Sequence, residues 1–194
     1  MFFENKKESD IEIIKKTLEN QDNFSLIILK YEDKLRRYIR RITNIHNDDI
    51  DDLLQDIFIS VYENINSFDK NLSFSSWIYR IAHNKTINNW KKYKKQIESI
   101  SIDEHLSFIE SIFNEDNLIL NLEKEEDKEL LQNALKNLDI KYKEVLTLKF
   151  IEVRDYKEIS DILEKPMGSI ATLISRGKKQ LKKEVVNLTK NYHD

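Results

Sequence analysis

The stretch that decides the fold is residues 155–183, DYKEISDILEKPMGSIATLISRGKKQLKK. Asp155 and Glu158 have the Asp-x-x-Glu spacing of a capping box, which predicts a helix over Asp155–Leu163. Glu164–Gly168 predicts a turn, and Ser169 is a good N-cap for a second, basic helix. A short helix, a tight turn and a basic helix are typical of a helix-turn-helix, a motif that enters the major groove of DNA.

The basic helix has two distinct faces at 100° per residue. Its apolar residues fall within about 60° of one another and predict a buried stripe; they are Ile170, Ile174, Gly177 and Leu181. Gly177 on this stripe predicts the close approach of another helix. The opposite side carries hydrogen-bond donors and cations, as a major-groove reader needs, and Ala171 can contact a thymine methyl group. These polar residues are Thr172, Ser175, Arg176 and Lys179. A solvated basic helix is the alternative interpretation.

The composition predicts an all-α protein. The 194 residues include only two glycines and one proline, whereas sheet proteins use both at hairpins and bulges. All three lie at Pro166, Gly168 and Gly177, so we expect the special backbone geometry to be concentrated there. The absence of cysteine excludes disulfides and thiolate metal sites. No apolar run approaches the ~20 residues of a membrane helix, and the N-terminus lacks the order of a signal peptide, so we expect a cytoplasmic protein.

Charge is segregated along the chain although the net charge is only −3. Residues 70–96 hold seven basic residues and no acidic one, and residues 165–183 are again basic without a carboxylate. Residues 98–129, between them, hold eleven acidic residues. Two basic segments separated by an acidic one predict two polyanion-binding modules and a tether.

The helical periodicity divides the chain into two helical domains joined by an acidic linker. We expect an N-terminal extension over 1–23 with a short helix at Ile11–Leu18, a helical bundle over 24–96, a linker over 97–121 and a helix-turn-helix domain over 122–194. The bundle helices are expected at Leu26–Ile42, Ile50–Ile65 and Trp77–Lys95, the last capped by Ser73 or Ser75. Two further helices are expected at Leu122–Leu138 and Lys141–Phe150.

Three stretches together resemble the sigma-70 family of RNA polymerase sigma factors. Ile50–Phe58, IDDLLQDIF, resembles the segment that grips the polymerase clamp helices. Phe68-Asp69 and Ser73–Asn84, SFSSWIYRIAHN, resemble the part that melts the promoter and reads the −10 element. Leu135–Leu181 resembles the −35-reading domain. No counterpart of the intervening domain of the housekeeping members is present, and this two-domain form is similar to the extracytoplasmic-function (ECF) sigma factors.

The resemblance implies roles for particular residues. The polymerase-binding flank comprises Asp52, Gln55, Asp56 and Ile59. The −10 residues are Phe68, Phe74, Arg80, Asn84, Lys85, Asn88 and Lys92. The −35 residues are Ala171, Thr172, Ser175, Arg176 and Lys179. Asp139, Ala171, Leu173 and Gly177 depart from the residues usual in the family, so no promoter sequence is carried over.

The resemblance also implies partners. These are the β′ clamp helices and β flap of core RNA polymerase, promoter DNA, and an anti-sigma factor, which is commonly membrane-anchored in this group. No cofactor, metal or small-molecule substrate is implied. We expect the free protein to bind promoters weakly, because each module offers few phosphate contacts and the linker can fold back on them.

Two other classes of function remain open. No catalytic motif is present, and the histidines have no metal-ligand spacing, so an enzyme is not expected. A metal-dependent all-α nucleotide hydrolase could use Asp51, Asp52 and Asp56 with carboxylates at Glu123, Glu125 and Glu126, but it would not need the helix-turn-helix. An ordinary DNA-binding regulator would bind duplex DNA without polymerase, as a symmetric dimer.

Overall fold

The computed structural model describes residues 8–43, 45, 47–69, 72–97, 134–135 and 137–191. Every regular element in these ranges is helical, which confirms the all-α prediction. None of the helices in these ranges combines the length and the apolar character that crossing a membrane requires. The acidic linker and most of the helix expected at Leu122–Leu138 lie outside the described residues.

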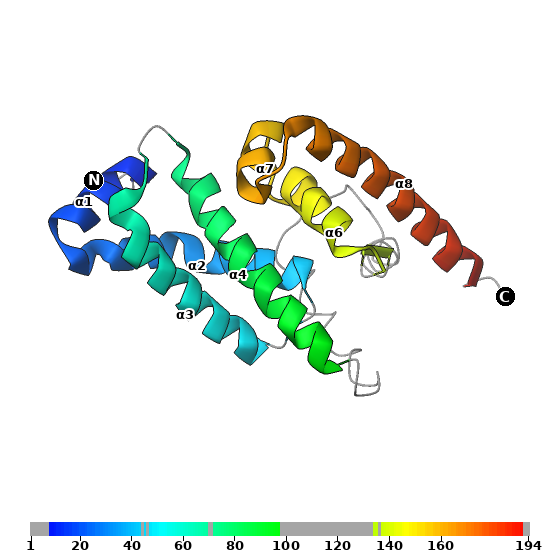
Figure 1. The fold of residues 1–194 in the computed structure, drawn as a ribbon, viewed down its shortest axis with the longest axis horizontal. Coiled ribbons are helices and arrows are strands. Elements are labelled where there is room, and N and C mark those ends of the chain that lie inside the picture. The colour runs from blue at the N-terminus through cyan, green and yellow to red at the C-terminus, as the bar shows by residue number, and fades with distance from the viewer. Residues whose placement is uncertain are drawn as a thin grey trace, which may run out of the picture.

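The N-terminal domain is a bundle of α1 (Asp10–Glu19), α2 (Ser25–Ile42), α3 (Asn47–Asn64) and α4 (Phe74–Ile97), with short 3-10 turns at Gln21–Phe24 (η1) and Ile65–Ser67 (η2) (Figure 1). Its core is built from the apolar stripes of these helices, including Ile27, Leu35, Ile57 and Ile78. The cap expected at Ser73 is present, since its hydroxyl accepts from the backbone N–H of Ser76 at 3.2 Å.

Helix α1 lies within the predicted N-terminal extension, yet it packs into the bundle. Ile13 and Ile14 are buried in the same core as α2 and α4. The Tyr31 hydroxyl of α2 donates to Asp10 at 2.8 Å. The extension therefore contributes a structural helix to the first domain.

The C-terminal domain consists of α6 (Ile140–Leu146), a π-helical turn at Thr147–Ile151 (η3), α7 (Tyr156–Leu163) and α8 (Met167–Asn191). The capping box at the start of α7 is confirmed, because the backbone N–H of Glu158 donates to Asp155 at 2.8 Å and the reverse bond is 3.0 Å. Helix α8 packs on α6 at Gly177, where an added Cβ would lie 3.3 Å from Leu146. The close approach predicted for Gly177 is thus confirmed.

Two details of the turn geometry differ from the prediction. Helix α8 begins at Met167, where the Pro166 carbonyl accepts from the N–H groups of Ser169 and Ile170, so Ser169 lies in the first turn and is not the cap. The left-handed backbone residues are Val153 (φ 53°) and Glu164 (φ 52°), and neither glycine has a positive φ. The special backbone geometry is therefore carried by ordinary residues.

Val153→Gly is expected to stabilise the protein. A β-branched residue at positive φ costs about 1–2 kcal/mol, and glycine adopts this conformation without strain while losing about 0.5–1 kcal/mol more backbone entropy on folding. The side chain is 70% exposed, so little burial is lost. Urea denaturation should show a free energy of unfolding higher by about 0.5–1 kcal/mol. The control Val186→Gly, within α8, should lower it; a loss of stability in both variants would contradict the strain at Val153.

Candidate nucleic-acid interface

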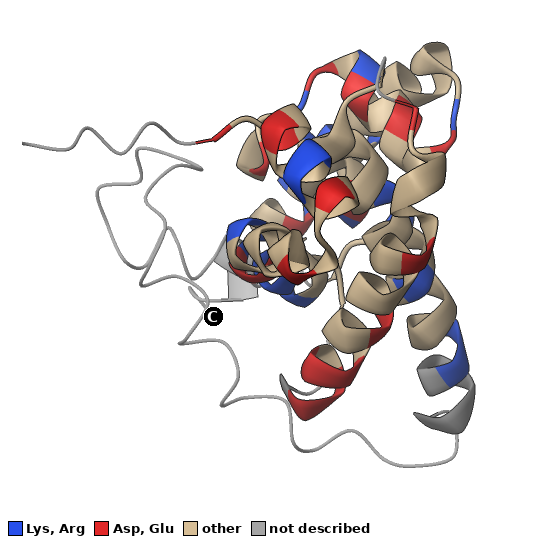
Figure 2. Ribbon diagram, turned by 90° about the vertical axis from the view of Figure 1, so that its left-hand side faces the viewer, with Lys and Arg blue, Asp and Glu red and all other residues tan. Residues whose placement is uncertain are grey.

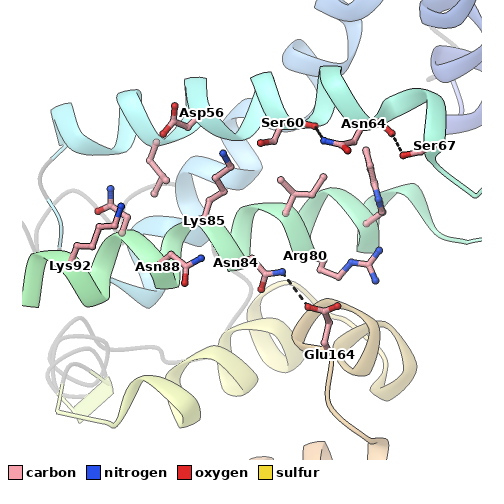
Figure 3. Close-up of a pocket in the computed structure, with 14 residues that line it drawn as sticks. Asp56, Ser60, Asn64, Ser67, Arg80, Asn84, Lys85, Asn88, Lys92 and Glu164 are labelled. Atoms are coloured by element: carbon pink, nitrogen blue, oxygen red, sulfur yellow. Dashed lines mark hydrogen bonds between the residues drawn. The ribbon is translucent and has the colours of Figure 1, made fainter.

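A groove of about 810 Å³ runs between α3 and α4. It gathers the polar residues predicted for −10 DNA, namely Arg80, Asn84, Lys85, Asn88 and Lys92. Figure 3 shows their side chains along α4, with Lys85 and Asp56 directed into the space between the two helices. The structure therefore brings five of the seven predicted residues to one concave, polar surface.

The groove also contains residues that the sequence pattern did not single out. Ser60, Asn64 and Ser67 line its far wall from α3 and η2 (Figure 3). Asn89 lines it from α4. Their hydroxyl and amide groups add donors and acceptors to the cations of α4. Ser60 and Asn64 continue from Asp56 at intervals of one helical turn, and this row of polar residues along α3 is a signal that could have found them.

Phe68 and Phe74 differ from their expected role. Both belong to the core, with exposures of 7% and 4%, and their ring centroids are 5.3 Å apart. Trp77 packs against both at 5.2 and 5.5 Å. The aromatic cluster fixes the start of α4 to the preceding loop, so in this structure neither phenylalanine is available to stack on a base.

The predicted polymerase-binding flank of α3 is a continuous exposed surface. Leu53, Ile57 and Val61 are buried, whereas the four flank residues Asp52, Gln55, Asp56 and Ile59 are exposed, Ile59 by 55%. Figure 2 shows acidic residues at the beginning of α3, at the lower edge of the view. Asp51 is instead paired with Arg36 of α2 at the surface of the bundle. The flank combines carboxylates with one apolar side chain, which suits a basic protein partner.

Helix α8 presents the two faces that the angular analysis predicts. Ile170, Ile174 and Gly177 are buried, and Leu181, the fourth residue of the predicted stripe, is partly buried against the core. All five predicted −35 residues are exposed, namely Ala171, Thr172, Ser175, Arg176 and Lys179. The Thr172 hydroxyl donates to the Gly168 carbonyl at 2.9 Å. The exposed face is confirmed, and its contact with DNA stays a prediction.

The two domains pack against each other, with α7 beside α4 (Figure 1). Asn84 at the groove edge donates to Glu164 of the C-terminal domain at 3.3 Å (Figure 3). His83, to which the sequence pattern assigned no role, is buried with Nε2 at 3.4 Å from Glu144. No sequence signal could have paired these residues, because they are distant in the chain.

Comparisons with known proteins agree with this geometry. The family model for sigma-70 region 2 matches residues 27–96, and that for sigma-70 region 4 matches residues 128–181. The ECF RNA polymerase sigma factor SigW of Bacillus subtilis (strain 168) is 33% identical over 177 residues, which cover 87% of this chain and 92% of SigW. The chain belongs to the ECF sigma factors of the sigma-70 family.

One further relative supports this assignment at greater distance, and one solved structure shares the fold. The ECF sigma-E factor of Escherichia coli (strain K12) is 25% identical over 173 residues, covering 86% of this chain and 88% of that protein. The fold is similar to the sigma factor RpoE solved in complex with the anti-sigma factor NepR from Bartonella quintana, with a TM-score of 0.63 at 19% identity over 84% of this chain and 96% of that one.

Membership in this family bears directly on the hydrolase interpretation that the sequence left open. Sigma factors are DNA-binding transcription initiation factors and not enzymes, so the hydrolase interpretation is dropped. Among the described residues no group of three His, Asp or Glu side chains is placed to hold a metal ion. Glu123, Glu125 and Glu126 of that interpretation lie outside the described residues.

Proposed function

We propose that this ECF sigma factor divides promoter recognition among three surfaces. The exposed flank of α3 binds core RNA polymerase, the groove between α3 and α4 holds the melted −10 strand, and the exposed face of α8 binds the −35 duplex. The observation that carries the proposal is the convergence of Arg80, Asn84, Lys85, Asn88 and Lys92 on one groove.

The groove has the chemistry for single-stranded DNA. Arg80, Lys85 and Lys92 supply cations for phosphates, while the amides of Asn84 and Asn88 can bond base edges. An unstacked base costs a few kcal/mol to extrude, about the gain from a small number of such interactions. Capture of the strand therefore depends on the additional free energy of binding to polymerase and to the −35 duplex.

The partners follow from this division of roles and from the relatives. SigW and sigma-E are RNA polymerase sigma factors by name, and RpoE was solved with an anti-sigma factor. We propose core polymerase through its clamp helices and flap, promoter DNA, and an anti-sigma factor as partners of this chain. Because core polymerase works on chromosomal DNA, the site of action is the cytoplasm.

Asn84→Ala tests the −10 assignment. Removing a base-edge hydrogen-bond pair worth about 1–3 kcal/mol should lower specific run-off transcription at least about fivefold. The measurement uses sigma-free bacterial core polymerase with the purified chain on genomic DNA fragments. Binding to core polymerase, measured separately, should be unchanged.

The matched control is Asn66→Ala, which alters an exposed amide that does not line the groove. It should transcribe like the unaltered chain. Equal transcription by the Asn84 and Asn66 variants would contradict the proposal that the groove holds the −10 strand. Failure of the unaltered chain to associate with core polymerase from a related bacterium would overturn the proposed function itself.

A further inference from the structure

A second cavity, of about 610 Å³, lies where the beginning of α1, helix α2, the beginning of α4 and the turn after η3 meet. None of its described lining residues belongs to the groove between α3 and α4, to the α3 flank or to the exposed face of α8. The lining carries two carboxylates and five cations, so positive charge is in excess. The cations are Lys30, Lys34, Arg37, Arg41 and Arg154.

Four of these cations form a row along one face of α2. The row consists of Lys30, Lys34, Arg37 and Arg41, at intervals of three or four residues, which make them neighbours on a helix surface. It is about 16 Å long at 1.5 Å per residue. Like charges at this spacing repel one another, and the low-dielectric walls of a cavity concentrate their field. The row therefore favours a bound anion.

Each end of the row is paired with one of the two carboxylates. Asp10 lies 2.9 Å from Lys30 and accepts from the Tyr31 hydroxyl at 2.8 Å. Glu152 accepts from Arg41 at 3.0 Å. Burial and the charge of Asp10 raise the pKa of Tyr31, so its hydroxyl adds no negative charge to the lining. The excess of positive charge therefore lies at the centre of the row.

The centre of the row is formed by Lys34 and Arg37, and Arg154 lines the same cavity from the turn after η3. Lys34 is exposed and Arg37 is half-buried, so a ligand from solvent can reach both. The Lys34 ammonium lies 5.4 Å from the centre of the Tyr31 ring, which also lines the cavity. The Arg154 guanidinium is held by Glu158 at 2.9 Å. Three cations from two elements thus border one space.

The chemistry of the lining favours a compact polyphosphate over a nucleic-acid strand. The amides of Asn84 and Asn88 in the first groove can bond base edges, whereas the described residues around this cavity include no Asn or Gln. Guanidinium groups bind phosphate oxygens through paired N–H···O bonds, and a lysine adds a point charge. The volume also lies within the range of about 300–1,000 Å³ that is usual for small-molecule sites.

We propose that the cavity bordered by Lys34, Arg37 and Arg154 binds a compact polyphosphate, such as the triphosphate group of a nucleotide or a short inorganic polyphosphate. The site is separate from the three surfaces of the proposed function and does not rest on it. The ligand neutralises cations that repel one another in its absence. Because it binds the folded chain, it should also raise the midpoint of thermal unfolding.

The proposal can be tested by isothermal titration calorimetry of the full chain with inorganic tripolyphosphate and, separately, with ATP. The buffer should contain ~0.15 M salt, which screens exposed charges beyond about 8 Å, and no divalent cations. Lys34→Gln with Arg37→Gln should weaken binding at least about tenfold, since two charge-assisted interactions are lost. Similar affinities for the two compounds would identify the phosphate chain as the ligand, and tighter binding of ATP would identify a nucleotide.

The matched control is Lys15→Gln with Lys157→Gln. It removes the same charge from exposed residues of α1 and α7 that do not line the cavity, and it should bind both compounds like the unaltered chain. Arg37→Lys keeps the charge but loses the planar guanidinium, so its affinity should be intermediate. If the double variant fails to fold, Lys34→Gln alone carries the test, because that side chain is exposed.

Absence of binding by the unaltered chain, or equal binding by the double variant and its matched control, would overturn the proposal. Tighter binding of a single-stranded oligonucleotide that is lost in the same double variant would also overturn it, because the cavity would then hold a strand. Calorimetry of the chain alone involves neither polymerase nor promoter, so its outcome is independent of run-off transcription, which tests the proposed function.

Discussion

Replacing both Asp52 and Gln55 by lysine should abolish binding of this sigma factor to core RNA polymerase. Both side chains are exposed on α3, while the neighbouring Leu53 and Leu54 are buried, so the exchange leaves the packed face of the helix unchanged. The proposed partner surface is a basic coiled coil. The two lysines would face this basic surface, so repulsion would replace the attraction of the original carboxylate. Like charges brought together at an interface cost several kcal/mol.

The expected loss in polymerase affinity is therefore at least about 100-fold. It can be measured by fluorescence anisotropy of the labelled chain titrated with sigma-free core polymerase. Thermal unfolding of the double variant should match that of the unaltered chain. Run-off transcription should disappear with the loss of binding.

The double variant has a closely matched control within the same domain. Glu19 and Gln21 are likewise an acid and a glutamine, both exposed, at the end of α1 and the start of η1. Glu19→Lys with Gln21→Lys introduces the same charge away from the α3 flank and should bind polymerase normally. Full binding by the Asp52 and Gln55 variant would show that polymerase contacts another surface.

The sequence predicts those parts of the fold that depend on local pattern. The buried stripe of α8 and the packing at Gly177 follow from apolar residues repeating at helical spacing, which the structure keeps. The capping box at Asp155 is likewise local, because its two partners are three residues apart. Such features need no knowledge of the rest of the chain.

Features set by tertiary packing could not be predicted. Phe68 and Phe74 flank a loop and carry no periodicity that distinguishes a core aromatic from an exposed one, and the structure buries both. Arg41 and Glu152 are 111 residues apart, so their ion pair depends on how the two domains meet. Val153 adopts a left-handed conformation that its side chain disfavours, and composition alone pointed to the glycines instead.

Replacing both Arg176 and Lys179 by glutamate should remove the dependence of transcription on the −35 element. The two side chains lie on the exposed face of α8, opposite the stripe that packs on α6. The hydrogen bonds that Glu152 and Arg154 make to the N-terminal domain involve α2, α4 and the turn after η3, and α8 takes no part in them. The variant is therefore expected to act on duplex binding.

The expected effect has two parts. Run-off transcription from a promoter with an intact −35 element should fall at least about tenfold, since each hydrogen-bonded pairing of a side chain with a base is worth about 1–3 kcal/mol. The slope of log affinity against log salt for the polymerase holoenzyme should become shallower by about one unit for each phosphate that is no longer neutralised. Both can be measured on paired templates with intact and scrambled −35 sequences.

Lys15→Glu with Lys141→Glu provides the same change in net charge on exposed residues of α1 and α6 and should leave the preference between the two templates intact. If the Arg176 and Lys179 variant still prefers the intact −35 template, α8 does not read the duplex. The exposed basic face of α8 would then have to bind a protein partner instead of DNA. If only the Arg176 and Lys179 variant loses its preference for the intact −35 template, the exposed face of α8 binds the −35 duplex. The position of these cations opposite the buried stripe then leaves them free to contact the DNA while the stripe packs on α6.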